Sequence, residues 1–267
     1  MRRLAPLLFI VLAACSVSPS RTADVSSRDA VARSLAPSGT LRAAINFGNA
    51  VLAQKDAAGG PRGVSVDLAN ELGRRLGVPV SFVLYNAAGK VVDGIKANEW
   101  DVGFFAIDPV RGVDTDFSAA YVIIEGTYLV REASPIRELR QVDVAGNRVV
   151  VATGSAYDLF LKRALKSATL TQATSSQAVV DTMLAQGAEV AAGVRQQLEI
   201  HQKRLPGLRM IEPRFMAINQ AMATPKGRDV GLRYLRAFVE EMKSSGFVAA
   251  SLKRHGIEGA AVAPPAG

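Results

Sequence analysis

The apolar positions in residues 41–108 change their spacing several times along the chain. Apolar side chains alternate in 41–46, as in a β-strand, and then recur every four residues in 65–77, as in an amphipathic helix. A second strand is expected over 78–85, a weaker helix over 90–98, and a third, strongly apolar strand over 100–108. This β-α-β-α-β order predicts a mostly parallel sheet with helices on both of its faces.

The second half of the chain repeats this alternation without repeating the sequence. Strands are predicted over 148–154, 169–173, 189–194 and 214–225, and helices over 155–165, 176–187, 196–205, 228–244 and 247–255. The last residues, 258–267, are expected to be disordered. The fold class indicated is α/β, and a chain of 267 residues with 49% hydrophobic residues is long enough for two lobes.

The N-terminal residues have the features of an export signal. Arg2 and Arg3 precede a short apolar run that ends at Cys15, the only cysteine of the chain. The run is too short for a membrane span, which needs roughly 20 apolar residues. Its ending, Leu-Ala-Ala-Cys, resembles the lipobox of bacterial lipoproteins, so 1–15 is interpreted as a lipoprotein signal peptide with Cys15 lipidated. The alternative is an ordinary cleaved signal with a chance cysteine.

Residues 16–37 follow this signal and are rich in serine, alanine and arginine. They are predicted to form a flexible tether that contains a short helix over 27–35. With no second cysteine, the exported chain cannot form an internal disulfide, so packing must stabilise it.

The charge of the chain suggests an anionic ligand or an anionic membrane surface. Lys and Arg number 32 and Asp and Glu 24; without Arg2 and Arg3 the balance is 30 to 24, or +6. No run of basic residues alternates with aromatic ones, so we expect no role with nucleic acid. Two separate histidines and no paired cysteine make a metal site unexpected, and no cofactor motif is present.

The segment Asp108-Pro109-Val110-Arg111 follows the third predicted strand, where an α/β sheet usually binds its ligand. The planar guanidinium of Arg111 suits a carboxylate. The alternative interpretation is that Asp108 and Pro109 only begin a helical turn and that Arg111 is solvated. A second candidate is the Gly154-Ser155 pair, where a strand runs directly into a helix whose first amides can bind an anion. There too, Ser155 can be only the helix cap and Gly154 only the turn.

Several modest motifs occur in an order that resembles a known family. They are GTLRAAIN, GPRGVSVDLANELGRRLG, WDVGFFAIDPVRGVDTDFSAAY, VAGNRVVVATGSAYDLFL, MLAQGAEVAAGV and FMAINQAMATPKG, followed by closing helices. From about Gly39 to Gly256 the chain resembles the periplasmic solute-binding proteins of polar amino-acid ABC transporters. This family has the type II fold, with two lobes that close on a ligand.

The resemblance implies a first lobe over 38–125 and 219–257, and a second lobe over 126–218. Two crossing strands, near 125–128 and 217–220, would form the hinge. The resemblance implies that Arg111 binds the ligand carboxylate. The helix start at Gly154 and Ser155 would then close on the ligand from the other lobe, and Phe47 would provide an aromatic ring that stacks on it.

Three positions depart from the family pattern. Arg195 stands where the family usually has the acidic residue that pairs with the ligand ammonium. Ala106 replaces a serine that also contacts the ammonium, and Asp108 replaces the threonine of the Thr-Pro-x-Arg turn. An arginine cannot pair with an ammonium, so Arg195 in the cleft would favour a second anionic group; alternatively, it is a surface residue that caps the next helix. Asp108 is expected either to neutralise an arginine or to bind the ammonium.

The first hypothesis for function is a monomeric, lipid-anchored periplasmic protein that delivers an amino acid or another small carboxylate to an ABC permease. An enzyme on the same fold, similar to the cyclohexadienyl dehydratases, is the alternative, with Asp108 or Glu125 as the acid or base. A ligand-sensing domain is a third possibility, but no transmembrane or signalling module follows the fold.

Overall fold

The computed structural model describes residues 20–267, with side chains from Ser27 onward. Cys15 and the rest of the predicted signal peptide lie outside the described residues, so that interpretation stays a prediction. Of the helices that are described, none is both long and apolar enough to cross a membrane.

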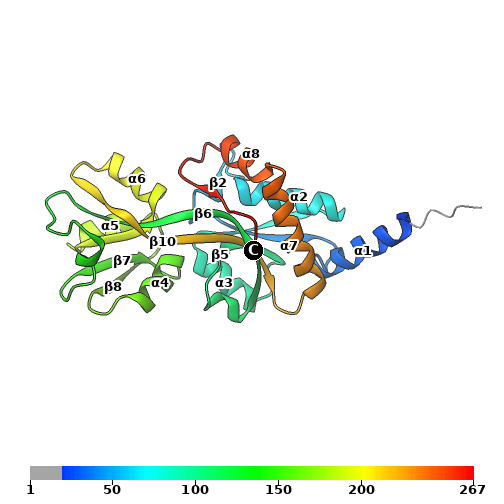
Figure 1. Ribbon diagram of the computed structural model, residues 1–267, viewed down its shortest axis with the longest axis horizontal. Helices are drawn as coiled ribbons and strands as arrows, with labels where there is room; N and C mark the ends of the chain where they lie inside the picture. Colours follow the sequence, from blue (N-terminus) through cyan, green and yellow to red (C-terminus); the bar gives the residue numbers. More distant parts are fainter. Residues whose placement is uncertain (1–19) are drawn as a thin grey trace, which may run out of the picture.

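The molecule is a two-lobed α/β structure in which one sheet runs through both lobes (Figure 1). The strand order is β4-β1-β5-β10-β6-β9-β7-β8, and the short strand β11 pairs with β6. The strands are β1 (Leu41–Asn46), β4 (Val80–Tyr85), β5 (Val102–Ala106), β6 (Thr115–Arg131), β7 (Arg148–Ala152), β8 (Thr169–Ala173), β9 (Val190–Val194), β10 (Leu208–Pro225) and β11 (Ala261–Val262), with β2 (Gln54–Lys55) and β3 (Pro61–Arg62) forming a separate pair.

Helices cover the sheet in each lobe. They are α1 (Ser20–Leu35), α2 (Val64–Leu76), α3 (Ala88–Lys96), α4 (Ala156–Ala164), α5 (Val179–Ala185), α6 (Arg195–Arg204), α7 (Asp229–Ser244) and α8 (Phe247–Arg254), with short 3-10 turns η1 (Arg111–Val113) and η2 (Leu139–Gln141). Leu68, Leu72 and Leu76, the apolar side chains that recur every four residues, are buried on α2, and Gly77 ends this helix with φ of 72°. The spacing of apolar residues therefore predicted which face of α2 meets the core.

β1, β4 and β5 are parallel in the first lobe and β7, β8 and β9 in the second, as the sequence predicts, but the two strands that join the lobes are not. β6 and β10 are long antiparallel partners, and Figure 1 shows both running from one lobe into the other. On the first lobe, Gln220 of β10 pairs with Ala106 of β5; on the second, Gly126 of β6 pairs with Val194 of β9. The hydrogen-bond ladder between β6 and β10 shifts its register between Ile211 and Met216. This pairing ties both lobes to the same two strands.

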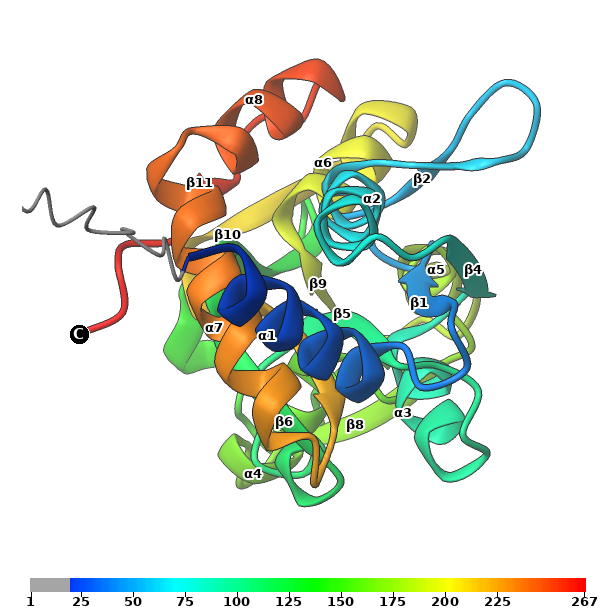
Figure 2. The same ribbon diagram turned by 90° about the vertical axis from the view of Figure 1, so that its right-hand side faces the viewer.

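Helix α1 extends the short helix expected inside the predicted tether. Its C-terminal end packs on α7, and Figure 2 shows α1 lying across that helix. Val31 and Leu35 are buried, and the Ser34 hydroxyl accepts a hydrogen bond of 3.1 Å from the amide of Gly231. The last part of 16–37 is thus fixed to the first lobe, because burial of these apolar side chains stabilises it there.

The C-terminal segment also differs from the expected disordered tail. Ala261 and Val262 pair with Ile123 and Val122 of β6, and the amide of Ala263 donates to the carbonyl of Tyr121 at 3.1 Å. The free edge of β6 provides the backbone partners, which is a tertiary effect that composition cannot reveal.

Candidate ligand-binding site

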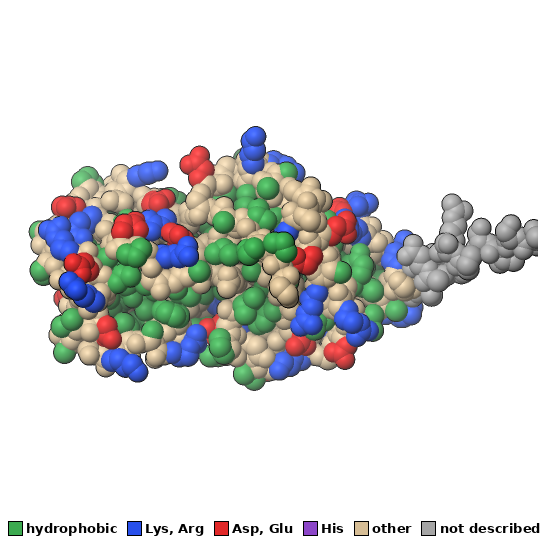
Figure 3. All heavy atoms as spheres, viewed as in Figure 1, with side chains coloured by type: hydrophobic (Ala, Val, Ile, Leu, Met, Phe, Trp, Pro, Cys, Tyr) green, Lys and Arg blue, Asp and Glu red, His purple; other side chains and the backbone are tan. Residues whose placement is uncertain are grey.

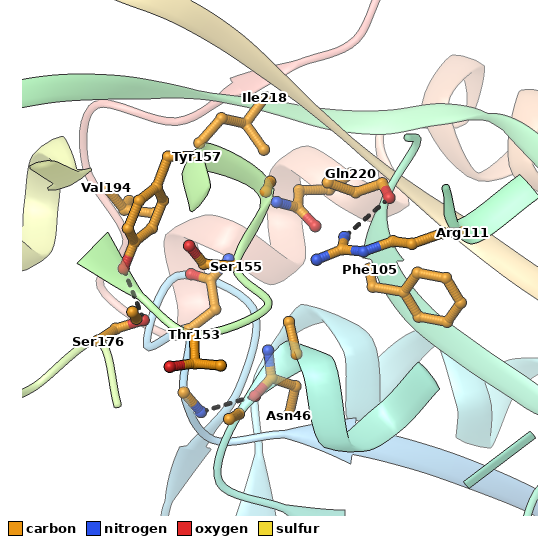
Figure 4. A pocket seen from close by; sticks show the side chains of 17 residues that line it. Asn46, Phe105, Arg111, Thr153, Ser155, Tyr157, Ser176, Val194, Ile218 and Gln220 are labelled. Carbon is orange, nitrogen blue, oxygen red and sulfur yellow. Dashed lines mark hydrogen bonds between the residues drawn. The ribbon is translucent and has the colours of Figure 1, made fainter. Parts of the chain in front are cut away.

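A small pocket lies between the two lobes, beside the strands that join them. Its volume is about 40 Å³, and its lining comes from the ends of β1 and β5 in the first lobe, β7 and α4 in the second, and β10 between them. Figure 4 shows the side chains of Asn46, Arg111, Ser155 and Gln220 converging on this space. We call it the inner pocket.

Arg111 gives the inner pocket its charge. It begins the short turn η1 and is only 2% exposed. Its Nη1 donates to the carbonyl of Ala106 and its Nη2 to the carbonyl of Gly154, each at 2.9 Å, while its buried Nε has no partner among the described residues. The guanidinium carbon lies 5.6 Å from the centre of the Phe105 ring. These contacts fix the orientation of the guanidinium and leave donors for an anion.

The electrostatics of the inner pocket favour a negative group. Among the described residues that line it, Arg111 is the only charged one. Burial lowers the pKa of Arg111 to about 10, although the nearby Asp108 charge acts in the opposite direction. Arg111 therefore remains protonated at neutral pH, and a carboxylate would find a cation there without a competing acid.

The start of α4 faces Arg111 from the second lobe. Gly154, with φ of 70°, turns the chain out of β7, and the Ser155 hydroxyl caps α4 by accepting the amide of Asp158 at 3.1 Å. The buried Asp158 carboxylate accepts the amide of Gly154 at 2.8 Å and the Lys162 ammonium at 2.9 Å. Ser155 thus caps the helix and also lines the inner pocket, and its role in binding an anion stays a prediction.

Several polar residues that line the inner pocket were not singled out from the sequence, among them Asn46, Tyr157 and Gln220. The hydroxyl of Tyr157 lies 3.1 Å from the Ser176 hydroxyl, and both residues line the pocket. Gln220 is 3% exposed, and its Oε1 has no hydrogen-bond partner within the part of the chain that the structure describes. A polar side chain in the middle of an apolar crossing strand was the signal that could have identified Gln220.

Asp108 faces the second lobe rather than the inner pocket. Its Oδ1 accepts the amide of Val110 at 2.9 Å, and its Oδ2 accepts Nη2 of Arg163 on α4 at 2.7 Å. Of the two roles expected for Asp108, it takes the neutralisation of an arginine, and the arginine is Arg163. It does not line the inner pocket, so its expected role as ammonium partner is not borne out by this geometry.

Arg195 does not supply a second cation to the inner pocket, which corrects that expectation. It is the first residue of α6, and its guanidinium turns toward the joining strands. Its Nε donates to Glu125 at 2.7 Å, and its Nη groups donate to Glu212 at 2.6 and 2.7 Å. The hydrogen bonds with Glu212 and Glu125 raise the pKa of Arg195 above its ordinary value. The two carboxylates, distant in sequence, determine where this side chain lies.

Phe47 does not stack in the inner pocket either. It lines a separate cavity on the outer side of the loop that follows β1, and Nζ of Lys55 lies 5.4 Å from the centre of its ring. Its carbonyl accepts Nε2 of Gln177 from the second lobe at 3.2 Å. Of the proposed site residues, the inner pocket brings together Arg111, Ala106 and Ser155, while Gly154 contributes its carbonyl.

The two lobes are in contact around the inner pocket. Besides the bonds from Arg111 to Gly154 and from Arg163 to Asp108, the backbones of Gly89 and Gly154 approach closely. A Cβ added to Gly154 would lie 2.9 Å from the Cα of Gly89, closer than packed atoms allow. The structure therefore represents a closed arrangement of the lobes.

The comparisons with known proteins agree with this architecture. Residues 41–257 match the model of the bacterial extracellular solute-binding proteins, family 3. The chain belongs to this family. The match confirms the resemblance read from the ordered motifs, and the fold of this family 3 protein is the mixed α/β type II fold. No curated protein sequence matches it.

Solved structures similar to this family 3 protein share its fold at low identity. The solute receptor for L-cysteine of Neisseria gonorrhoeae is 21% identical, with a TM-score of 0.72 over 85% of this chain and 93% of its own. A putative ABC-transporter binding component from Wolinella succinogenes, complexed with lysine, is 20% identical, with a TM-score of 0.70 over 81% and 95%. A histidine kinase sensor domain is 18% identical, with a TM-score of 0.72 over 84% and 98%.

One structurally similar protein is an ancestral binding protein that is described as a precursor of an enzyme. An ancestral amino acid-binding protein described as a precursor of cyclohexadienyl dehydratase is 21% identical, with a TM-score of 0.69 over 82% of this chain and 95% of its own. At these identities the likeness establishes the fold alone, so the ligand has to be argued from the inner pocket.

Proposed function

We propose that this protein is an extracytoplasmic solute-binding protein that captures a small carboxylate between its lobes and delivers it to an ABC permease. The observation that carries the proposal is Arg111, a buried arginine that is the only charged residue among the described residues lining the inner pocket. Several structurally similar proteins are described as binding amino acids, which supports a ligand of this size and class.

The carboxylate of the proposed ligand binds those N–H donors of Arg111 that are not already bonded to the carbonyls of Ala106 and Gly154. A guanidinium has five N–H donors, and two of them are used by Ala106 and Gly154. The Ser155 hydroxyl faces the same space from the second lobe. An anion held by both groups bridges the lobes and favours closure.

A ligand ammonium would have only neutral acceptors. None of the described residues that line the inner pocket carries a carboxylate. Oε1 of Gln220, which has no partner among the described residues, is the acceptor best placed for a ligand N–H or O–H. We therefore include both amino acids and organic acids in the ligand class, with a net charge that is zero or negative.

The side chains named for the enzymatic alternative are held in ion pairs, which supports binding over catalysis. Asp108 pairs with Arg163, and Glu125 pairs with Arg195 and Arg214. Burial raises the pKa of Glu125, but the hydrogen bonds from Arg214 and Arg195 together lower it by more. The net shift of this pKa is therefore downward. A carboxylate whose pKa is lowered in this way is a poor proton donor at neutral pH and also a weak base.

The proposed location follows from the N-terminal sequence. A lipidated Cys15 would hold the protein at a membrane outside the cytoplasm, and the family description refers to extracellular proteins. On the face shown in Figure 3, basic and acidic side chains are interspersed rather than gathered in one basic surface. That distribution supports a small-molecule partner rather than nucleic acid.

A ligand screen tests the proposal directly. Thermal shifts are measured with amino acids, keto acids, dicarboxylates and aromatic acids, since a ligand of the folded state raises its melting temperature. Calorimetry on each hit then compares wild type with Arg111→Met. Loss of the buried charge pair is expected to cost about 2–5 kcal/mol, roughly 30- to 5000-fold in affinity.

Arg140→Met is the matched control, because Arg140 is 80% exposed and lines neither the inner pocket nor its neighbours. It is expected to bind like wild type. An Arg111→Met protein that folds and binds the ligand with wild-type affinity would remove Arg111 from the site and with it the basis of the proposal.

A further inference from the structure

A larger cavity adjoins the inner pocket on its open side. Its volume is about 450 Å³, and it shares Gly48, Asn49, Ser176 and Val194 with the lining of the inner pocket. We call it the outer cavity. The loop that follows β1, helix α6 and the turn 256–259 surround it, so both lobes contribute to its walls.

The inner pocket alone is too small for most ligands. A water molecule needs about 10–15 Å³ on the same measure, so about 40 Å³ corresponds to roughly three waters. That space accommodates a carboxylate and the atoms next to it. The rest of a larger ligand has to leave the inner pocket.

The contacts between the lobes restrict where that extension can lie. The Gly89–Gly154 approach and the Arg111–Gly154 bond close the side of the inner pocket toward α3, and the Arg163–Asp108 pair lies beyond them. Val194 and Ser176, which line both spaces, lie on the side of the inner pocket away from Arg111 (Figure 4). A ligand with its carboxylate on Arg111 would therefore extend into the outer cavity.

We infer that the ligand is an elongated monocarboxylate, with its head on Arg111 in the inner pocket and an uncharged tail of alkyl and amide character in the outer cavity. This inference rests on the proposed function and specifies its substrate class. It concerns the outer cavity, which a free amino acid held in the inner pocket would leave empty.

The lining of the outer cavity fits such a tail. Val51, Ile200 and Ile257 provide apolar surface, and Ile200 is 53% exposed although it lies on this wall. The amide side chains Gln54, Gln196 and Gln197 provide donors and acceptors for amide groups.

The polar groups of the outer cavity do not select a charged tail. Gln196 donates through Nε2 to the Glu258 carbonyl at 3.1 Å, and no described residue bonds its buried Oε1. Glu199 and Lys203 carry opposite charges one helical turn apart on α6. A tail that is neutral and able to donate one hydrogen bond matches this wall.

A series of ligands with one head and different tails tests the inference. N-acetylglycine, N-butanoylglycine and N-hexanoylglycine share the carboxylate and differ only in alkyl length. Calorimetry on the whole protein is expected to give a dissociation constant that falls about fourfold with each methylene that becomes buried. Arg111→Met is expected to abolish detectable binding of all three.

Ile200→Trp separates the two spaces. The larger side chain fills part of the outer cavity, so N-hexanoylglycine is expected to bind at least tenfold more weakly while N-acetylglycine changes less than twofold. Val144→Trp is the matched control, because Val144 is 49% exposed in the same lobe and lines neither space. It is expected to leave the series unchanged.

The outcomes separate this inference from the proposed function. Equal affinity along the series, still dependent on Arg111, overturns the elongated ligand and leaves the carboxylate site intact. A gain with tail length that Ile200→Trp does not reduce also overturns the inference, since the tail then lies elsewhere. If no member binds, the inference is wrong, and the broader ligand screen with Arg111→Met decides the proposed function independently.

Discussion

Nη2 of Arg163 donates a hydrogen bond of 2.7 Å to Oδ2 of Asp108 across the boundary between the two lobes. Arg163 belongs to α4 of the second lobe, and Asp108 follows β5 of the first. Asp108 is 5% exposed, whereas the Arg163 side chain is 45% exposed, so one end of the pair is shielded and the other is open to water. The closed arrangement therefore includes an ion pair formed between protein side chains alone.

Removing this ion pair is expected to favour opening. A half-exposed pair contributes about 0.2–1 kcal/mol, so Arg163→Ala should weaken ligand affinity by roughly 1.4- to 5-fold and enlarge the radius of gyration of the unliganded protein. Small-angle scattering and calorimetry measure the two effects. A double-mutant cycle with Asp108→Asn isolates the pair from other effects of each change. Additive effects of the two variants would show that the pair does not couple the lobes.

The close approach of Gly89 and Gly154 predicts a second effect on closure. Gly154→Ala introduces a Cβ that meets the Cα of Gly89 only when the lobes are closed. Gly187→Ala is the matched control, because Gly187 has a similar φ of 64° but no atom of the described residues within 4 Å of the added Cβ.

Both alanine variants are expected to lose about 1–2 kcal/mol of unfolding free energy from the left-handed backbone. Only Gly154→Ala should also weaken ligand binding, by about 1–3 kcal/mol for the overpacked contact. Denaturant unfolding and calorimetry on both proteins check this difference. Equal affinities of the two variants would contradict the importance of this contact for closure.

The pKa of Arg111 predicts how binding depends on pH. Burial lowers this pKa to about 10, so the cation is present throughout pH 6–9 and is lost as the pH rises through 10. Affinity for a monocarboxylate should stay constant from pH 6 to 9 and then fall at higher pH, as calorimetry can measure. A titration midpoint within pH 6–9 would point to another group in the site.

The same shift has the opposite sign for stability. The folded pKa of Arg111 lies below its unfolded value, so the cost of burying the cation is fully present below pH 10 and is relieved as the pH rises above it. Loss of binding above pH 10 should therefore occur without loss of folded protein through this residue. Circular dichroism at the same pH values provides that control.

The interpretation of Cys15 predicts the location of the mature protein. Cys15→Ser is expected to block lipid attachment, so the protein should move from the membrane fraction to the soluble fraction or stay unprocessed. Cell fractionation and mass spectrometry of the N-terminus measure both results, with Ser16→Ala as the control. A wild-type protein that is soluble and begins elsewhere would contradict the lipoprotein interpretation.

The chain alone identified the features that depend on near neighbours in sequence. Apolar spacing predicted α2 with its buried leucine face, and the end of a strongly apolar strand predicted where Arg111 would lie. The turn at Gly154 and the cap at Ser155 also followed from a few adjacent residues. Such features are predictable because backbone geometry and burial act over one or two turns of chain.

The partners of charged and aromatic side chains were decided by the tertiary structure. Arg195 was expected in the cleft, but Glu125, 70 residues away, and Glu212, 17 residues away, hold it at the joining strands. Asp108 pairs with Arg163, which lies 55 residues away in the sequence. A charged side chain lies where the nearest opposite charge and the surrounding water lower its free energy most, and that position exists only once the two lobes are placed together.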